Sequence, residues 1–130
     1  MNLALKEPTT LRDQPKATLA DTAVRAISAT IIDAPTTRRH RLSNTEVTHQ
    51  GYVLVSVTLE NGAVGIGEAS TLGGPRWAEE SVESIAATVT KYLAPALYGR
   101  PAIAFEDNTL RLAKAAKRNF SAKAAVESAL

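Results

Sequence analysis

Hydrophobic and polar residues follow a strand-like pattern in the first half of the chain. Val24 to Ile32 is rich in β-branched residues and stops before Pro35, which predicts a first strand. Tyr52 to Glu60 places three valines and a leucine on one face, the period of two of a half-buried strand. Asn61-Gly62 then predicts a two-residue type I′ turn, so that Ala63 to Ala69 pairs back as a third antiparallel strand.

The second half of the chain changes to a helical period. Apolar residues at spacings of three and four predict a helix from about Ala78 to just before Pro95, with Glu79, Glu80 and Glu83 favouring its first turns. A second helix is predicted from Ala104 to Arg118, with Phe105, Thr109, Leu112 and Ala116 on its apolar side. A third is predicted after Asn119 and is capped by Ser121; its inward side is formed by Ala122, Ala125, Val126, Ala129 and Leu130.

These patterns together predict an α+β domain, in which a three-stranded antiparallel sheet is followed by helices. Residues 1–22 carry prolines and charges without a sustained period, so we expect a disordered N-terminal tail, with the folded domain over residues 23–130. The last helical pattern runs up to Leu130 with no terminating Gly, Asn or Pro after it, which favours either the front piece of a longer protein or a gene product truncated relative to its relatives.

Composition excludes several classes of protein. The 130 residues include no cysteine, which excludes disulfides and cysteine-based sites, and no apolar run has the length of a membrane span or a signal peptide. We therefore expect a cytoplasmic protein that binds no membrane. The net charge is only +2, and the basic cluster of residues 38–41, Arg-Arg-His-Arg, has no neighbouring aromatic residue, so nucleic-acid binding is not expected.

The segment after the third predicted strand is rich in glycine: Gly65 to Trp77 reads GIGEASTLGGPRW. It lacks the third glycine and the following helix of a dinucleotide fingerprint, and no Gly-Lys-Ser/Thr follows for a phosphate loop. Gly65 and Gly67 are therefore interpreted as structural. His40 and His49 have no partner at metal-ligand spacing, so we expect no metal site in this chain. For Trp77 the pattern leaves a packing role and a binding role open.

From about Ala23 to Leu130 the chain resembles the amino-terminal capping domain of muconate cycloisomerase, the muconate lactonizing enzyme of the enolase superfamily. The resemblance lies in four segments: IIDAPTTRRHRL, YVLVSVTLENGAVGIGEASTLGGPRWAEES, LAPALYGR and NFSAKAAVESAL. Gly-x-Gly-Glu after a hairpin occurs across the superfamily. The Ser-Thr-Leu-Gly-Gly that follows it here is typical of the muconate and chloromuconate branch.

The resemblance implies a cap joined to a modified (β/α) barrel that holds a divalent metal, Mn²⁺ or Mg²⁺, in a homo-oligomeric enzyme. Such enzymes interconvert cis,cis-muconate, a dicarboxylate, and muconolactone, while the metal stabilises an enolate-like intermediate. The catalytic Lys-x-Lys and the metal ligands of the family lie on the barrel, and this chain ends before a barrel begins. We therefore expect no catalytic residue, cofactor-binding residue or metal ligand in this chain, and no activity from it alone.

The resemblance assigns the role of a substrate lid to two segments, the loop around Thr36 to Leu42 and the loop from Ser70 to Trp77. The candidate residues of this lid are Ser70, Thr71, Leu72, Trp77, Arg38 and His40. Leu72 matches a position at which an aliphatic residue packs against the substrate. Trp77 matches a position at which muconate enzymes often have tyrosine and chloromuconate enzymes often have tryptophan. Closure of such loops would exclude water and shape the pocket.

Two alternatives stay open. The chain could be the cap of another enolase-superfamily enzyme, such as a dipeptide epimerase or an acyl-amino-acid racemase, since residues 70–77 discriminate only weakly among these branches. It could also be a free-standing interaction module, whose exposed face binds a partner protein. The first alternative is decided by the barrel that accompanies the cap, and the second by the behaviour of the isolated chain in solution.

Overall fold

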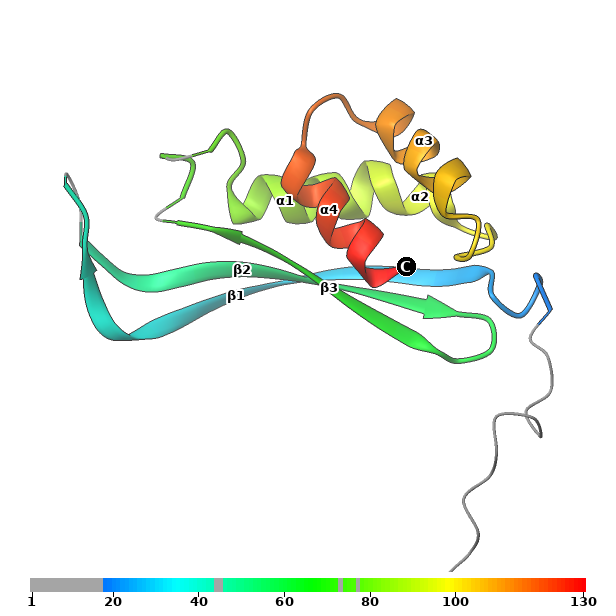
Figure 1. Cartoon of the computed structure of the whole chain (residues 1–130), viewed down its shortest axis with the longest axis horizontal. Coiled ribbons are helices and arrows are strands. Elements are labelled where there is room, and N and C mark those ends of the chain that lie inside the picture. The colour runs from blue at the N-terminus through cyan, green and yellow to red at the C-terminus, as the bar shows by residue number, and fades with distance from the viewer. Residues whose placement is uncertain (1–17, 44–45, 73, 77) are drawn as a thin grey trace, which may run out of the picture.

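A computed structural model describes residues 18–130 apart from residues 44, 45, 73 and 77. The predicted three-stranded antiparallel sheet followed by helices is confirmed (Figure 1). The strands are β1 (Val24–Arg41), β2 (Glu46–Leu59) and β3 (Val64–Thr71), and the helices are α1 (Val82–Thr88), the π-helix η2 (Val89–Leu93), α2 (Ala94–Leu97), α3 (Phe105–Ala115) and α4 (Phe120–Ala129).

Strands β1 and β2 are much longer than the sequence predicted. The segment 36–42, expected as a loop, is extended and belongs mainly to β1. Pairing continues to Pro35 opposite His49, shifts, and resumes with His40 opposite Val47. The extra residues of β1 form a bulge at this shift, where the Thr36 hydroxyl donates to the Thr48 carbonyl at 3.1 Å. Proline is tolerated because β1 is an edge strand.

The turn between β2 and β3 differs from the predicted type I′ turn. Gly62 has a φ of +84°, but Asn61 is not among the residues with positive φ. The Gly62 amide donates to the Leu59 carbonyl at 3.0 Å, and the Leu59 amide donates to the Ala63 carbonyl at 2.9 Å. This pattern indicates a three-residue connection with glycine in the left-handed region. The Asn61 side chain also accepts from the Ala63 amide, which stabilises the turn.

The first helical segment runs over α1, η2 and α2, so both of its predicted ends were wrong. It begins at Val82, because Ser81 and Ser84 cap each other's backbone in a capping box. It also continues past Pro95. The π-helix immediately before this proline lets the Ala94 amide donate to the Val89 carbonyl, and the proline sits in the first turn of α2, where its missing N–H costs little.

Helix α3 buries only part of the side that the sequence predicted. Leu112 is buried as predicted and Thr109 and Ala116 are half-buried, whereas Phe105 is exposed and Asn108 is buried in addition. The Asn108 side-chain amide donates to the Pro101 carbonyl at 2.9 Å and to that of Ala102 at 3.4 Å, so it ties the helix to the preceding turn. These hydrogen bonds satisfy the buried amide nitrogen of Asn108, whereas its Oδ1 atom is buried with no hydrogen-bond partner among the described residues.

Helix α4 buries the predicted alanines and Val126, but its predicted cap was wrong. The N-cap position is Asn119, which has a left-handed backbone and makes no side-chain cap. Ser121 instead donates its own backbone N–H to the carboxylate of Glu80. The prediction that Glu80 interacts with the dipole of the first helix was therefore wrong, because its carboxylate contacts the start of α4.

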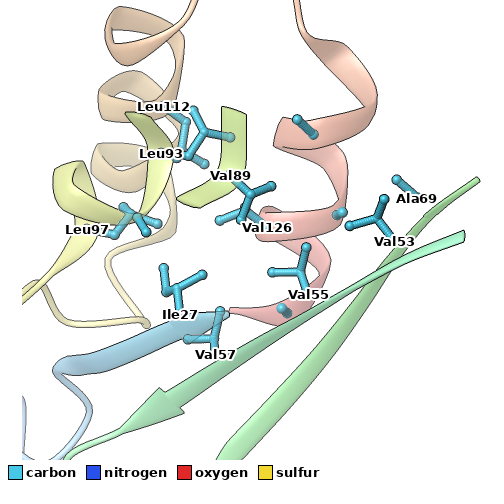
Figure 2. Close-up of a cluster of buried hydrophobic side chains, with 14 of the residues drawn as sticks. Ile27, Val53, Val55, Val57, Ala69, Val89, Leu93, Leu97, Leu112 and Val126 are labelled. Atoms are coloured by element: carbon cyan, nitrogen blue, oxygen red, sulfur yellow. The ribbon is translucent and has the colours of Figure 1, made fainter. Parts of the chain in front are cut away.

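The hydrophobic core lies between one face of the sheet and the helices, which all cover that face (Figure 1). Val53, Val55 and Val57 of β2 point toward the helices, where Leu93 and Val126 are among their neighbours (Figure 2). The far face of the sheet is not covered by the described residues, and Val64 and Ile66 there are 56% and 59% exposed. The domain is thus a two-layer structure with one open face.

Gly65 and Gly67 let α4 lie directly on β3. A Cβ atom at Gly65 would collide with the Ala129 carbonyl oxygen, and one at Gly67 would collide with that of Ala125. The structural interpretation of these glycines is supported by this close approach of a helix backbone to a strand.

Most of the expected N-terminal tail lies outside the described residues. Its last part, residues 18–22, forms a turn in which the Thr18 amide and hydroxyl both donate to the Asp21 carboxylate. These hydrogen bonds lower the pKa of Asp21. The Asp21 carbonyl accepts a hydrogen bond from the Asn61 amide, and the Thr22 carbonyl accepts one from the Ala102 amide. This turn therefore joins the β2–β3 end of the sheet to the segment between α2 and α3.

Candidate functional site

Two segments extend beyond the packed body at the same end of the domain. The first, which we call the arm, is the distal part of the β1–β2 hairpin, residues 33–41 and 46–50. The second, the β3–α1 loop, comprises residues 72–81. Figure 1 shows the arm reaching past the helices, beside the end of the sheet from which the β3–α1 loop leaves. The Gln50 side chain donates to the Thr71 carbonyl at 2.8 Å and so joins the arm to the base of this loop.

A cavity of about 410 Å³ lies between the arm, the β3–α1 loop and the start of α1. Its walls comprise Ile31, Ile32, Asp33, His49 and Gly51 from β1 and β2, Thr71 from β3, Gly74 and Pro75 from the loop, and Ser81, Val82 and Glu83 around the start of α1. These walls mix aliphatic side chains with a few polar groups. This composition is typical of a small-molecule site.

The polar groups of the cavity have partners of their own. A hydrogen bond from the Ser81 side chain, together with the backbone amide of Glu83 itself, lowers the pKa of the Glu83 carboxyl, so this group is ionised at neutral pH. The His49 Nδ1 atom lies 3.2 Å from the Thr48 hydroxyl. Asp33 and Glu83 make the cavity itself acidic, whereas the basic residues lie farther out on the arm.

The predicted lid residues of β3 and its loop are split between two faces. Thr71 is buried and lines the cavity. Ser70 pairs with Tyr52, is exposed, and points to the opposite face of the sheet because side chains alternate along a strand. Leu72 follows directly after β3 and is 36% exposed. Trp77, the remaining candidate of this loop, lies outside the described residues.

Arg38 and His40 lie on β1, in or next to the bulge, and are exposed. Neither lines the cavity. Their neighbour Arg39 forms an exposed ion pair with Glu46, at 3.4 Å between Nη1 and Oε1. The expected loop of basic residues is therefore an extended, solvent-exposed strand segment, and the predicted residues of the two segments do not converge on one point.

Three residues of this region were not predicted in the roles that the structure gives them. His49 and Asp33 line the cavity, and their positions two residues apart in register on neighbouring strands could have been found only with strand pairing extended past Ile32 to Pro35. Glu80 was assigned to the wrong helix, because a carboxylate next to a helix start is commonly a dipole partner of that helix. No local signal in the sequence shows that it reaches α4.

Within residues 18–130, leaving aside the four positions not described, no three His, Asp or Glu side chains form a group that could hold a metal ion. The residues present therefore do not fit the divalent metal implied by the resemblance. No helix in the described part of the chain is long and apolar enough to cross a membrane.

Residues 26–130 match the family described as mandelate racemase / muconate lactonizing enzyme, N-terminal domain. The chain belongs to this family. The resemblance found in the sequence is thereby confirmed, and so is the interpretation of the fold as an enolase-superfamily cap. The match includes the whole sheet from Ala26 onward and all the helices, so it covers both the arm and the β3–α1 loop.

Cycloisomerases are prominent among the similar proteins. Chloromuconate cycloisomerase CbnB of Cupriavidus necator is 45% identical over 107 residues, which are 82% of this chain and 29% of that protein. Muconate cycloisomerase 1-1 of Acinetobacter lwoffii is 37% identical over 112 residues, 86% of this chain and 30% of that protein. The chain thus spans less than a third of the length of these curated relatives.

Solved structures agree with this picture. A muconate lactonizing enzyme from Pseudomonas fluorescens, complexed with muconolactone, superposes with a TM-score of 0.81 at 34% identity, over 84% of this chain and 29% of that chain. The 2-chloromuconate cycloisomerase from Rhodococcus opacus 1CP gives a TM-score of 0.77 at 42% identity, over 82% of this chain and 29% of that chain.

Proposed function

We propose that this chain is the substrate-capping part of a muconate or chloromuconate cycloisomerase, and that it acts together with a barrel. The observation that carries the proposal is the 45% identity to chloromuconate cycloisomerase CbnB across nearly the entire folded domain. In this proposal the complete enzyme interconverts a cis,cis-muconate and the corresponding lactone. The chain by itself is inactive, because the groups that transfer the proton belong to the barrel.

The arm and the β3–α1 loop form the substrate-facing end of the cap in this proposal. Both extend from the packed body at one end, where an apposed barrel mouth can be covered without disturbing the core. Leu72 supplies partly exposed apolar surface next to the buried Thr71 at the end of β3. Trp77 adds to this surface in the proposal, whereas Ser70 points to the opposite face of the sheet. Arg38 raises the positive potential of the arm, which attracts a dianionic substrate to this end of the cap, and His40 offers a hydrogen-bonding ring beside it.

Further features of the complete enzyme belong to the same proposal. A bound Mn²⁺ or Mg²⁺ would supply electrostatic stabilisation of negative charge that develops on the substrate. Since the described residues of this chain offer no metal-ligand group, its ligands come from the barrel. We further propose that the complete enzyme is a cytoplasmic homo-oligomer. In the same proposal, Leu72 and the arm contribute to substrate binding and to the exclusion of water from the pocket.

A cap exchange tests the proposal. The matched segment of chloromuconate cycloisomerase CbnB is replaced by residues 23–130 of this chain, and loss of the conjugated diene of muconate or chloromuconate is followed by absorbance. We expect the chimeric enzyme to be active and the isolated chain to be inactive. A folded chimera that turns over neither substrate contradicts the proposal. A second chimera with Trp77→Tyr tests selectivity: a changed preference between the two substrates is expected, and an unchanged preference removes Trp77 from that role.

The open face of the sheet favours one other function, that of a free-standing interaction module. Val64 and Ile66 are exposed on this face, on an edge strand. A module of this kind predicts a monodisperse isolated chain that unfolds cooperatively. The cap proposal predicts that the isolated chain associates through its exposed apolar surfaces. Size-exclusion chromatography with light scattering of the purified chain separates these two outcomes.

A further inference from the structure

Glu80 connects the end of the β3–α1 loop to a helix that begins 40 residues later in the chain. Its Oε2 atom accepts a hydrogen bond from the Ser121 backbone N–H at 2.8 Å, and its Oε1 atom accepts one from the Ala122 N–H at 3.1 Å. Both amides belong to the first turn of α4. Glu80 is only 5% exposed, so these hydrogen bonds, and not water, stabilise its carboxylate.

The first turn of α4 has no cap of its own. Asn119 is of a residue type favoured at N-caps, but its backbone is left-handed and its side chain is used elsewhere. Its amide oxygen accepts from the Thr88 hydroxyl at 3.2 Å, and its nitrogen donates to the Lys117 carbonyl at 2.7 Å. A local cap would satisfy α4 without involving the β3–α1 loop. The cap used here comes from the loop itself.

The other end of the loop is held to the same part of the molecule. The Thr71 carbonyl, at the end of β3, accepts from the Gln50 side chain. Strand β3 in turn lies against α4 through Gly65 and Gly67, where the strand and the helix backbone are in direct contact. Both ends of the β3–α1 loop are therefore attached to one block made of β2, β3 and α4. The Thr71 carbonyl and the Glu80 carboxylate are thus two points at which the loop is fixed to this block.

We propose that Glu80 is a positioning residue: by holding the end of the β3–α1 loop to α4, it sets the orientation of this loop, and of Leu72 within it, over the substrate pocket. The proposal rests on the capping function proposed above. It differs from a role in helix stability alone, because it requires that loss of the Glu80 cap changes the motion of loop residues that do not belong to α4. Glu80 acts through the loop and touches no reacting atom.

The single tryptophan of the chain, Trp77, provides a probe inside the loop. We would compare the wild-type chain with Glu80→Gln and with the matched control Glu79→Gln, which removes the same charge from the exposed neighbouring residue. Amide hydrogen exchange of Ser121 and Ala122 reports whether the cap is lost. Time-resolved fluorescence anisotropy of Trp77 reports the motion of the loop on the nanosecond timescale.

In Glu80→Gln we expect the two amides to exchange at least about fivefold faster, because a charge-assisted cap is weakened. We expect the amplitude of the fast depolarisation of Trp77 to rise in the same variant. Both quantities should stay at the wild-type value in Glu79→Gln. If the amides exchange faster while the Trp77 anisotropy is unchanged, Glu80 is a helix cap only and the proposal is overturned. Unchanged exchange of the two amides also overturns it.

Should Glu80→Gln fail to fold, Glu80→Asp is measured in the same way, since it keeps the charge and shortens the reach by one methylene. The same direction of change in both observables is expected, and unchanged anisotropy with faster exchange again overturns the proposal. Because these measurements use no substrate, they decide the role of Glu80 separately from the activity of the chimeric enzyme. In an active chimera, Glu80→Gln should in addition lower kcat/KM, whereas Glu106→Gln, which removes the same charge from an exposed residue of α3, should leave it unchanged.

Discussion

The two halves of the long β1–β2 hairpin are used in opposite ways. In the half under the helices, Val53, Val55 and Val57 are completely buried, and each contacts the helical layer. In the arm the same two strands continue with mostly exposed polar and basic side chains, and Val47 is the exception. One hairpin therefore supplies both a packed core and a projecting element. Substitutions in the core half should change stability, and those in the arm should change recognition.

The largest effect is expected where the body is packed most tightly. In Gly67→Ala the new Cβ collides with the Ala125 carbonyl, so α4 must move away from β3 at a cost of at least about 3 kcal/mol in the free energy of unfolding. The matched control is Gly62→Ala. No atom lies near that position, and only the left-handed backbone opposes the substitution, at about 1 kcal/mol. Urea unfolding followed by circular dichroism measures both, and equal losses would contradict the close packing.

Cavity formation in the core should be the next largest effect. Val55→Ala removes two buried methyl groups between the sheet and the helices, and we expect a loss of about 2 kcal/mol in the free energy of unfolding. Val64→Ala makes the same chemical change on the open face and should cost less than about 0.5 kcal/mol. A similar loss in the two variants would mean that the open face is covered in solution.

In the arm, stability and recognition should separate. We expect Arg38→Ala combined with Arg41→Ala to change the free energy of unfolding by less than about 0.5 kcal/mol, because both side chains are exposed. In the chimeric enzyme, kcat/KM for a dicarboxylate should fall at low ionic strength, and the difference should vanish at high salt. Arg25→Ala, an exposed arginine of β1 outside the arm, is the control. An equal fall in kcat/KM in Arg25→Ala would contradict a specific role of the arm in substrate attraction.

The smallest effect concerns a surface cluster of the body. Hydrogen bonds from Arg111 at 2.8 Å and from Arg100 at 2.9 Å lower the pKa of Asp107 below its ordinary value of 3.8. The ionised Asp107 therefore stabilises the folded state above the pKa that this carboxyl has in the unfolded chain. This stabilisation is lost as the pH falls through the lower pKa of the folded state. Asp107→Asn should lower the thermal midpoint at pH 7, and the two proteins should converge at pH 2. A constant difference across this range would contradict the assignment.

Most of the body could be predicted from the sequence. The alternation of Val53, Val55 and Val57 identifies the buried face of β2, and the alanine spacing of α4 identifies its inner side, because both are consequences of local period. Gly65 and Gly67 were assigned a structural role, but the helix that contacts them lies about 60 residues later and no local rule names it.

The candidate site was predicted less well, for identifiable reasons. Pairing of the arm continues past Pro35 because β1 lies at the sheet edge, and the length of its bulge depends on tertiary structure. The cap of α4 comes from Glu80, which is distant in sequence, while the predicted cap Ser121 receives this hydrogen bond at its own backbone N–H, and the Asn119 side chain bonds to Thr88 and Lys117. Long-range hydrogen bonds of this kind decide the shape of the β3–α1 loop, and residue type alone does not encode them.

The most direct test of the substrate-facing role of this end of the domain is Leu72→Ala in the chimeric enzyme, compared with Leu110→Ala. Leu110 is an exposed leucine on α3, within the helical layer. The proposal predicts that Leu72→Ala lowers kcat/KM for muconate or chloromuconate by about tenfold, as expected for loss of an apolar contact to the substrate, and that Leu110→Ala leaves it unchanged. Equal values of kcat/KM for Leu72→Ala and the unmodified chimera, with the fold intact, would contradict it.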